Sequence, residues 1–183
     1  MKAIYSVTYQ VIGEEINSLG LFNSMDEAKD AIALHECGGS FDDYSSADIE
    51  ELVSDINNQL SMIYYNEGMF YSDGDVEYHV HEWHFDDDFT IENDMFEVVH
   101  LEVIPCDEIH ESIGLTHSLS CCSKIILGFE EMRRANIDED LSDEEKLNMV
   151  SVIDEVIAEN GQILFDEGDV CYCIVTHKFS NEK

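Results

Sequence analysis

Residues 66–85 read NEGMFYSDGDVEYHVHEWHF, and residues 160–179 read NGQILFDEGDVCYCIVTHKF. The two stretches share the first Asn, a Gly-Asp-Val triplet, the Tyr two residues after it and the last Phe, all at a separation of 94 residues. NSLGLFNS at 17–24 matches ESIGLTHS at 111–118, and Glu50-Glu51 matches Glu144-Glu145, at the same separation. Because self-similarity at a fixed separation indicates internal repeats, we expect a gapless tandem duplication.

The repeats are expected over residues 1–94 and 95–183. Alternating apolar residues predict strands at 3–11 and 96–104, each followed by a second strand centred on a glycine. Two helices follow in each repeat; Ser24 with Glu27 and Ser142 with Glu145 are helix-start signatures. Acidic glycine turns at 72–75 and 166–169 then predict a hairpin. The expected fold class is α+β, a tandem duplication of a ββααββ unit with antiparallel sheets, two helices per repeat and a pseudo-twofold relation.

The chain carries 42 Asp and Glu against 8 Lys and Arg, a formal net charge of −34. A magnitude of about 2 to 8 is usual for a small soluble domain. Both repeats are acidic, with 22 acids against two bases in residues 1–94 and 20 against six in residues 95–183. Because such self-repulsion destabilises a compact state, we expect the charge to serve a cationic partner or a salt-rich solvent.

Duplex DNA carries one charge per about 1.7 Å of its axis, so this net charge corresponds to roughly 58 Å of duplex. A compact chain of this length has a diameter of roughly 40 Å, so its charge per length approaches that of nucleic acid. In charge and size it resembles the acidic DNA-mimic inhibitors of phages and mobile elements, the anti-restriction and anti-CRISPR proteins, which occupy the DNA-binding groove of a host enzyme. The resemblance rests on no shared motif, and it implies a role for no individual residue.

The resemblance implies an inhibitor in the host-cell cytoplasm that binds a basic, DNA-binding host protein and itself binds neither nucleic acid nor a membrane. The candidate partner-binding residues are carboxylates at the second helix of each repeat and in the loop after the long strand. They are Asp42, Asp43, Asp48, Glu50, Glu51, Asp55, Asp86, Asp87, Asp88, Asp138, Glu139, Asp140, Asp143, Glu144 and Glu145. Acids at a helix start also serve capping and the helix dipole. The alternatives are an acidic adaptor or inhibitor of a basic surface unrelated to DNA, and a soluble protein of a high-salt cytoplasm.

Two strands also carry metal-ligating residue types: His79 and His81 in one repeat, and Cys171, Cys173 and His177 in the other. These are weak candidates for a transition-metal site. The repeats disagree, since the two histidines align with a Cys and a Val, so we expect no metal and no cofactor. The other interpretation is a partly buried second sheet face or an interface between the halves. The Asp86 to Asp88 run lacks the alternating ligands and central Gly of a calcium loop.

The sequence contains no G-x-S-x-G, P-loop, dinucleotide or Cys-x-x-Cys motif, so we expect a protein that is not an enzyme. The opening MKAIYSVTYQVI lacks the basic and apolar segments of a signal peptide. No apolar run has the length needed to span a bilayer. Six Cys without a secretory address predict reduced thiols in a cytoplasm. The oligomeric state is left open.

Overall fold

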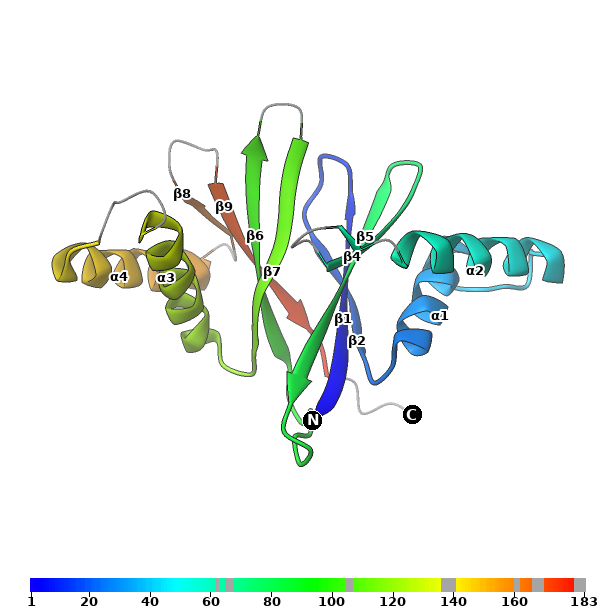
Figure 1. Cartoon of the computed structure of the whole chain (residues 1–183), viewed down its shortest axis with the longest axis horizontal. Helices are drawn as coiled ribbons and strands as arrows, with labels where there is room; N and C mark the ends of the chain where they lie inside the picture. Colours follow the sequence, from blue (N-terminus) through cyan, green and yellow to red (C-terminus); the bar gives the residue numbers. More distant parts are fainter. Residues whose placement is uncertain are drawn as a thin grey trace. The chain divides into compact units, whose positions relative to one another are not determined.

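The computed structural model of the chain describes residues 1–61, 63–64, 68–104, 107–135, 141–159, 162–165 and 170–179. Within these residues the fold is α+β, with two antiparallel sheets and four helices (Figure 1). The chain divides into two compact units, Met1–Thr90 and Ile91–Lys183. The division falls four residues before the boundary expected after residue 94.

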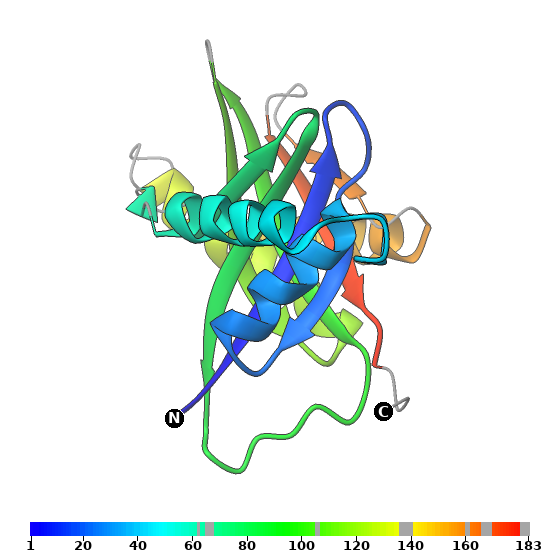
Figure 2. The same ribbon diagram turned by 90° about the vertical axis from the view of Figure 1, so that its right-hand side faces the viewer.

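Unit 1 contains a five-stranded sheet in the order β2-β1-β5-β4-β3, with two helices between β2 and β3. Its elements are β1 (Lys2–Val11), β2 (Asn17–Phe22), α1 (Met25–Glu36), α2 (Ser46–Leu60), β3 (Ile63–Tyr64), β4 (Gly68–Asp73) and β5 (Val76–Phe85). The two-residue strand β3 was not predicted. Figure 2 looks at this unit from its helical side, where α1 and α2 both lie in front of the sheet.

Unit 2 contains a four-stranded sheet in the order β7-β6-β9-β8, and two helices connect β7 to β8. Its elements are β6 (Met95–Ile104), β7 (Asp107–Thr116), α3 (Leu119–Ala135), α4 (Asp143–Glu159), β8 (Gln162–Phe165) and β9 (Val170–His177). In each unit the first strand therefore lies between the second strand and the last. The predicted strands and helices are confirmed, and the loop at 166–169 lies outside the described residues.

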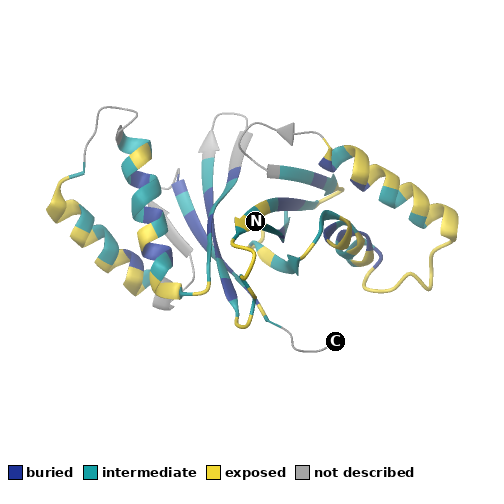
Figure 3. Ribbon diagram, turned by 60° about the horizontal axis from the view of Figure 1, so that its bottom comes forward, coloured by how far each residue is buried: buried dark blue, intermediate teal, exposed yellow. Residues whose placement is uncertain are grey.

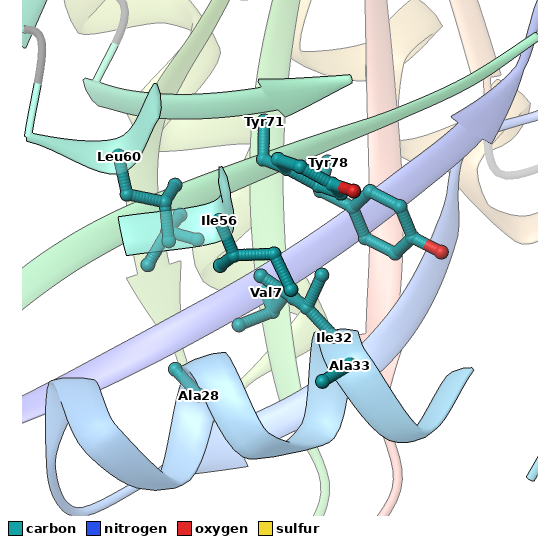
Figure 4. Close-up of a cluster of buried hydrophobic side chains, with 9 residues drawn as sticks. Val7, Ala28, Ile32, Ala33, Ile56, Leu60, Tyr71 and Tyr78 are labelled. Carbon is teal, nitrogen blue, oxygen red and sulfur yellow. The ribbon is translucent and has the colours of Figure 1, made fainter. Parts of the chain in front are cut away.

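The core of unit 1 lies between its sheet and its helices (Figure 4). Val7 on β1 and Tyr78 on β5 point to the same side of the sheet and are fully buried. Ile32 on α1 and Ile56 on α2 pack against them. Each helix buries residues spaced four apart, which is the spacing of one helix face.

Unit 2 has a matching core between β6, β9 and its two helices. Val98, Tyr172, Ile126 and Ile153 are fully buried there. The prediction that the strand face carrying Tyr78 and its counterpart Tyr172 is core is therefore confirmed. Alternation along a strand places these side chains on the helical side of each sheet.

The gapless separation of 94 residues is wrong for the first strand of each unit. Both first strands show a register shift, after Val7 in β1 and after Val98 in β6. These valines lie opposite Gly20 and Gly114, respectively. The glycines are 94 residues apart, whereas the valines are 91 apart. Between the paired Val and Gly, unit 1 has 12 residues and unit 2 has 15, so the hairpin of the first two strands is three residues longer in unit 2, a change that a gapless separation cannot represent.

The second helices show another shift. Their N-terminal serines, Ser45 and Ser142, are 97 residues apart, and each accepts a hydrogen bond from the backbone N–H three residues later. The expected match of residues 50–51 with residues 144–145 is therefore wrong. Glu145 instead occupies the position that Asp48 occupies in α2. Both serines form a capping box with these carboxylates.

The first helix of unit 1 begins as predicted, but with a different carboxylate contact. The Glu27 backbone N–H donates to Ser24 Oγ at 3.2 Å, so Ser24 is the N-cap. The Glu27 carboxylate accepts from the backbone N–H of Asn23, not from that of Ser24. Among the helices of the described residues, none has the length and apolar character required to cross a membrane.

Candidate functional site

Helix α2 carries an exposed acidic surface of unit 1. Its inward face is fixed by the buried Ile56 and Leu60, and its start is fixed by the Ser45 capping box. Glu50, Glu51 and Asp55 lie on the outward side and are exposed. Figure 3 shows this outward side and the preceding connection largely in yellow, as exposed residues.

The carboxylates of α2 follow the helix in a row. Asp48, Glu51 and Asp55 are three and four residues apart, a spacing that places side chains on one helix face. At about 1.5 Å of rise per residue, the successive carboxylates are roughly 4.5 and 6 Å apart along the axis. Phosphates of one DNA strand follow each other at about 3.4 Å along the duplex axis. A small surface depression lies on the same helix and is lined by Glu51, Asp55 and Asn58, among others.

The connection between α1 and α2 extends this acidic surface. Helix α1 ends where the Gly39 backbone N–H bonds the carbonyl of Leu34 at 2.8 Å. Gly38 and Gly39 have φ angles of 69° and 86°, a region that L side chains rarely adopt. The two glycines thus allow the chain to turn away from the helix axis, and the exposed Asp42 and Asp43 follow this turn.

We call residues 37–60 the acidic segment. It contains six Asp and Glu and no Lys, Arg or His. None of the ion pairs found in the described residues involves a carboxylate of this segment. The Lys and Arg pairs lie in unit 2, where Lys146 contacts Glu131 and Lys178 contacts Asp94. The acidic segment therefore keeps its charge without local neutralisation.

The predicted loop Asp86 to Asp88 follows β5 and is exposed. Its backbone closes a turn, since the Phe89 N–H donates to the carbonyl of Asp86 at 3.0 Å. Phe85 and Phe89 stack at a ring distance of 4.0 Å across this turn. The Asp87 carboxylate lies 2.8 Å from the N-terminal amine, and both groups are exposed. This loop is a separate acidic turn, not a continuation of α2.

In unit 2, Asp143, Glu144 and Glu145 lie in the exposed first turn of α4. Asp138, Glu139 and Asp140 lie outside the described residues. Lys146 follows directly and pairs with Glu131 at 2.7 Å. The start of α4 is therefore acidic, but a base lies within it.

Two of the predicted contact residues stabilise helix starts. Asp48 accepts from the Ser45 hydroxyl at 2.7 Å, and Glu145 accepts from the Ser142 hydroxyl at 2.6 Å. These serine hydrogen bonds hold the pKa of both carboxyl groups below the usual values. Both acids are thus committed to capping, and the other exposed acids of the acidic segment are the better candidates for partner contact.

The metal candidates lie in different packing environments. His81 packs on Trp83 at a ring distance of 4.2 Å, and His79 lies edge-on to Phe70 at 5.2 Å. No group of three or more His, Cys, Asp or Glu side chains in the part of the chain that is described is arranged to hold a metal ion.

The unit 2 candidates also have neighbours of their own. Cys171 and Cys173 alternate on β9 with sulfur atoms 3.7 Å apart. His177 Nε2 lies 2.6 Å from a carboxylate oxygen of Glu97, and both side chains are buried. The His177–Glu97 contact joins β9 to β6, whereas the two cysteines lie on the same strand. The expected interface between the halves stays a prediction.

A buried ionic cluster in unit 2 was missed by the sequence analysis. Glu130 at the end of α3 is fully buried, and its carboxylate accepts hydrogen bonds from Arg133, Arg134 and the Tyr172 hydroxyl. Burial alone raises the pKa of the Glu130 carboxyl, but the bonds from Arg133 and Tyr172 outweigh it and lower the pKa overall. The counterpart in unit 1 is Glu36. The Tyr78 hydroxyl there lies 2.6 Å from His35 Nδ1, and its pKa is raised first by burial and then by the neighbouring Glu36 carboxylate.

A sequence signal for this cluster was present. Glu36 and Glu130 are identical at a separation of 94 residues, as are Tyr78 and Tyr172. Two identities that meet in space, one on a helix and one on a strand, indicate a shared structural contact. Because Glu130 and Tyr172 at the centre of the cluster are fully buried, we assign it to stability.

His100 on β6 is a second buried polar group, 3% exposed, beside Phe129 and Tyr172. Neither ring nitrogen has a hydrogen-bond partner in the described residues, and Glu102 and Glu111 lie 3.9 and 4.0 Å away. Burial lowers the pKa of the imidazole below 6.5, although Glu102 opposes the shift. The folded state therefore holds this histidine neutral where the unfolded chain protonates it.

We expect a His100→Phe variant to lose part of the acid sensitivity of the fold. The pKa of His100 is depressed in the folded state, so its contribution to stability is present above pH 6.5 and is lost as the pH falls through the folded pKa. Urea unfolding between about pH 8 and pH 5.5 measures this slope. His117→Asn, at an exposed position, is the control. Equal pH slopes for His100→Phe and wild type would contradict the assignment.

The acidic segment can act chemically as an acceptor of hydrogen bonds and as an electrostatic attractor of Lys and Arg side chains. Its exposed carboxylates come from one helix and one connection of unit 1. Comparisons with protein-family models, with curated proteins and with solved structures find no match to this chain.

Proposed function

We propose that this protein is an acidic inhibitor that mimics nucleic acid and blocks the basic nucleic-acid-binding groove of a host protein. It would act in the manner of the phage and mobile-element inhibitors that it resembles in charge and size. One observation carries the proposal. The acidic segment has six exposed carboxylates, no base and no ion pair in the described residues.

The mechanism requires only electrostatic attraction to the basic groove and physical occupation of that groove. A row of carboxylates on a fixed helix attracts a groove lined with Lys and Arg and speeds encounter at low salt. Once docked, it fills the space that a phosphate backbone would take. Association of a carboxylate surface with a basic groove releases bound counterions, and dissolved ions screen the attraction. The affinity of the complex therefore falls steeply as the salt concentration rises.

We also infer that the two units arose by tandem duplication of one ββααββ unit. The shared strand order, the two second-helix capping boxes and the two Glu-Tyr contacts support this. The separation of equivalent residues changes within the hairpin of the first two strands and in the connection between the two helices, and turns and connections tolerate changes of length. Both units would then descend from one acidic unit, and each still has a negative net charge.

The function is tested with the whole chain as bait in a bacterial lysate, eluted with a salt gradient and identified by mass spectrometry. A DNA-binding protein that elutes at elevated salt and is displaced by duplex DNA is the expected result. Capture that duplex DNA does not displace would overturn mimicry in favour of an adaptor of another basic surface. The absence of any enriched basic protein would leave the charge as an adaptation to salt.

A matched pair of variants locates the binding surface. Glu50→Gln, Glu51→Gln and Asp55→Asn together remove three exposed charges from α2. At about 0.5 kcal/mol for each exposed charge, we expect binding of the captured protein to weaken on the order of tenfold.

The control carries Glu14→Gln, Glu15→Gln and Asp75→Asn, which removes equal charge from exposed turns of the same unit. Calorimetry or fluorescence anisotropy measures both affinities. Equal losses in the two variants would show that net charge alone is sensed, and the acidic segment would not be the contact surface.

A further inference from the structure

The acidic segment also exposes two aromatic rings. Phe41 is 37% exposed and Tyr44 is 44% exposed, on either side of Asp42 and Asp43. Aromatic residues are enriched at the centres of binding surfaces, where they act as anchors.

Backbone hydrogen bonds close the chain around these residues into a turn. The Tyr44 N–H donates to the carbonyl of Phe41 at 3.1 Å, which closes a turn over the two aspartates. The Asp42 N–H donates to Ser40 Oγ at 3.1 Å. The backbone of the turn, residues 41–44, is therefore held in one conformation, so little backbone entropy is lost on binding.

We propose that the turn of residues 41–44 is an anchor for arginine side chains of the partner. This rests on the proposed function and names the residue type that the acidic segment recognises. A guanidinium group stacks on an aromatic face and at the same time donates hydrogen bonds to a carboxylate. Phe41 and Tyr44 supply the faces, and Asp42 and Asp43 supply the acceptors.

Charge complementarity selects this occupant over an apolar peptide or a second copy of the chain. The acidic segment contains no base, so a second copy would bring carboxylates against carboxylates. A lysine ammonium is a strongly hydrated point charge and uses the rings less well than arginine. In a nucleic-acid-binding groove, arginine contacts phosphates and stacks on bases. The turn offers both kinds of contact, a carboxylate for the phosphate and a ring for the base.

The test uses two labelled peptides of equal length, one all arginine and one all lysine, titrated with the full chain. Fluorescence anisotropy is measured at physiological ionic strength. Because the two peptides carry equal charge, electrostatics alone predicts equal affinity. We expect the arginine peptide to bind roughly fivefold or more tightly, through the two ring contacts.

A ring-deleted variant then tests the turn itself. Phe41→Ala with Tyr44→Ala should remove the preference for arginine and leave lysine binding unchanged. Leu147→Ala with Val152→Ala, at positions 73% and 52% exposed on α4, is the control that should keep the preference. Asp42→Asn with Asp43→Asn keeps both rings and should weaken both peptides, the arginine peptide more.

The two proposals fail in distinguishable ways. Equal binding of the two peptides by the wild type, or an unchanged preference in the ring-deleted variant, overturns the arginine anchor while the acidic segment can still bind a basic groove. Failure of both peptides to bind at physiological salt removes the electrostatic basis of the proposed function as well. Circular dichroism of each variant confirms that the comparison is made between folded chains.

Discussion

Replacing Glu130 with glutamine is expected to destabilise the fold by about 3 kcal/mol, the magnitude found when one partner of a buried ion pair is removed. Glu130 is fully buried, and it accepts from Arg133 Nη2 at 3.0 Å and Arg134 Nε at 3.3 Å. In glutamine an NH2 group replaces one carboxylate oxygen, so one of the arginine N–H groups loses its acceptor and faces another donor. The substitution also weakens the hydrogen bond that the fully buried Tyr172 hydroxyl donates to this side chain, because the acceptor is no longer charged. Urea unfolding at neutral pH measures the loss.

The pH dependence of this loss has a defined sign. The pKa of Glu130 is lowered below its usual 4.5 in the folded state. Its contribution is therefore fully present above pH 4.5 and is lost as the pH falls through the folded pKa. The stability difference between the wild type and Glu130→Gln should shrink in acid. A difference that grows on acidification would contradict the assigned ionic state.

The neighbouring residue provides the control. Glu131 is 41% exposed and pairs with Lys146 at 2.7 Å. An exposed pair contributes roughly 0 to 1 kcal/mol, so Glu131→Gln should change the free energy of unfolding by less than about 1 kcal/mol. Similar losses in the two variants would show that the buried cluster is not a centre of stability in unit 2.

The melting temperature of the whole chain is expected to rise with salt by on the order of 10 °C between about 0.01 M and 1 M NaCl, as the Debye length falls from about 30 Å to about 3 Å. The net charge of −34 produces repulsion that the folded state concentrates and the unfolded chain relieves. Screening therefore stabilises the folded state more than the unfolded one. Differential scanning calorimetry measures the midpoints, and two transitions are expected if the units unfold separately.

The three-charge α2 variant checks the cause of the salt effect. Glu50→Gln, Glu51→Gln and Asp55→Asn remove repulsion from a segment without bases, so this variant should melt higher than wild type at low salt and respond less to added NaCl. A melting temperature that does not change with salt would exclude self-repulsion as a major energy term. A chain that folds only near molar salt would favour the alternative of a high-salt cytoplasm.

Much of the fold follows from local sequence patterns. Strand alternation predicted β1 and β6, and the Ser142 to Glu145 spacing predicted the start of α4. The core face of β5 and β9 was predicted for the same reason, since a period of two fixes which side chains share a face. The short strand β3 and the unequal separations of the two first strands were not predicted. They depend on pairing between strands and on loop length, which a gapless alignment cannot represent.

For the candidate site too, the sequence predicts some properties of the carboxylates and only the fold decides others. Asp48 and Asp55 are equivalent in a list of acids, yet Asp48 caps α2 through Ser45. Glu130 is a charged residue followed directly by Glu131, so its residue type predicts a surface position, although it is buried. Tyr172, which makes it a core residue, is 42 residues away in sequence. Local spacing therefore identifies helix faces, but it does not identify which carboxylates the fold itself uses.

The sequence by itself determined the sign and size of the charge, the strands and helices, and the near-absence of bases around α2, because composition and periodicity are local properties. The tertiary structure decided which carboxylates face solvent and which stabilise the fold, because burial and ion pairing join residues distant in sequence. It placed Phe41 and Tyr44 at the surface beside two aspartates. It also placed the buried Glu130 beside Tyr172, where the hydrogen bonds to the carboxylate must offset the cost of burying its charge.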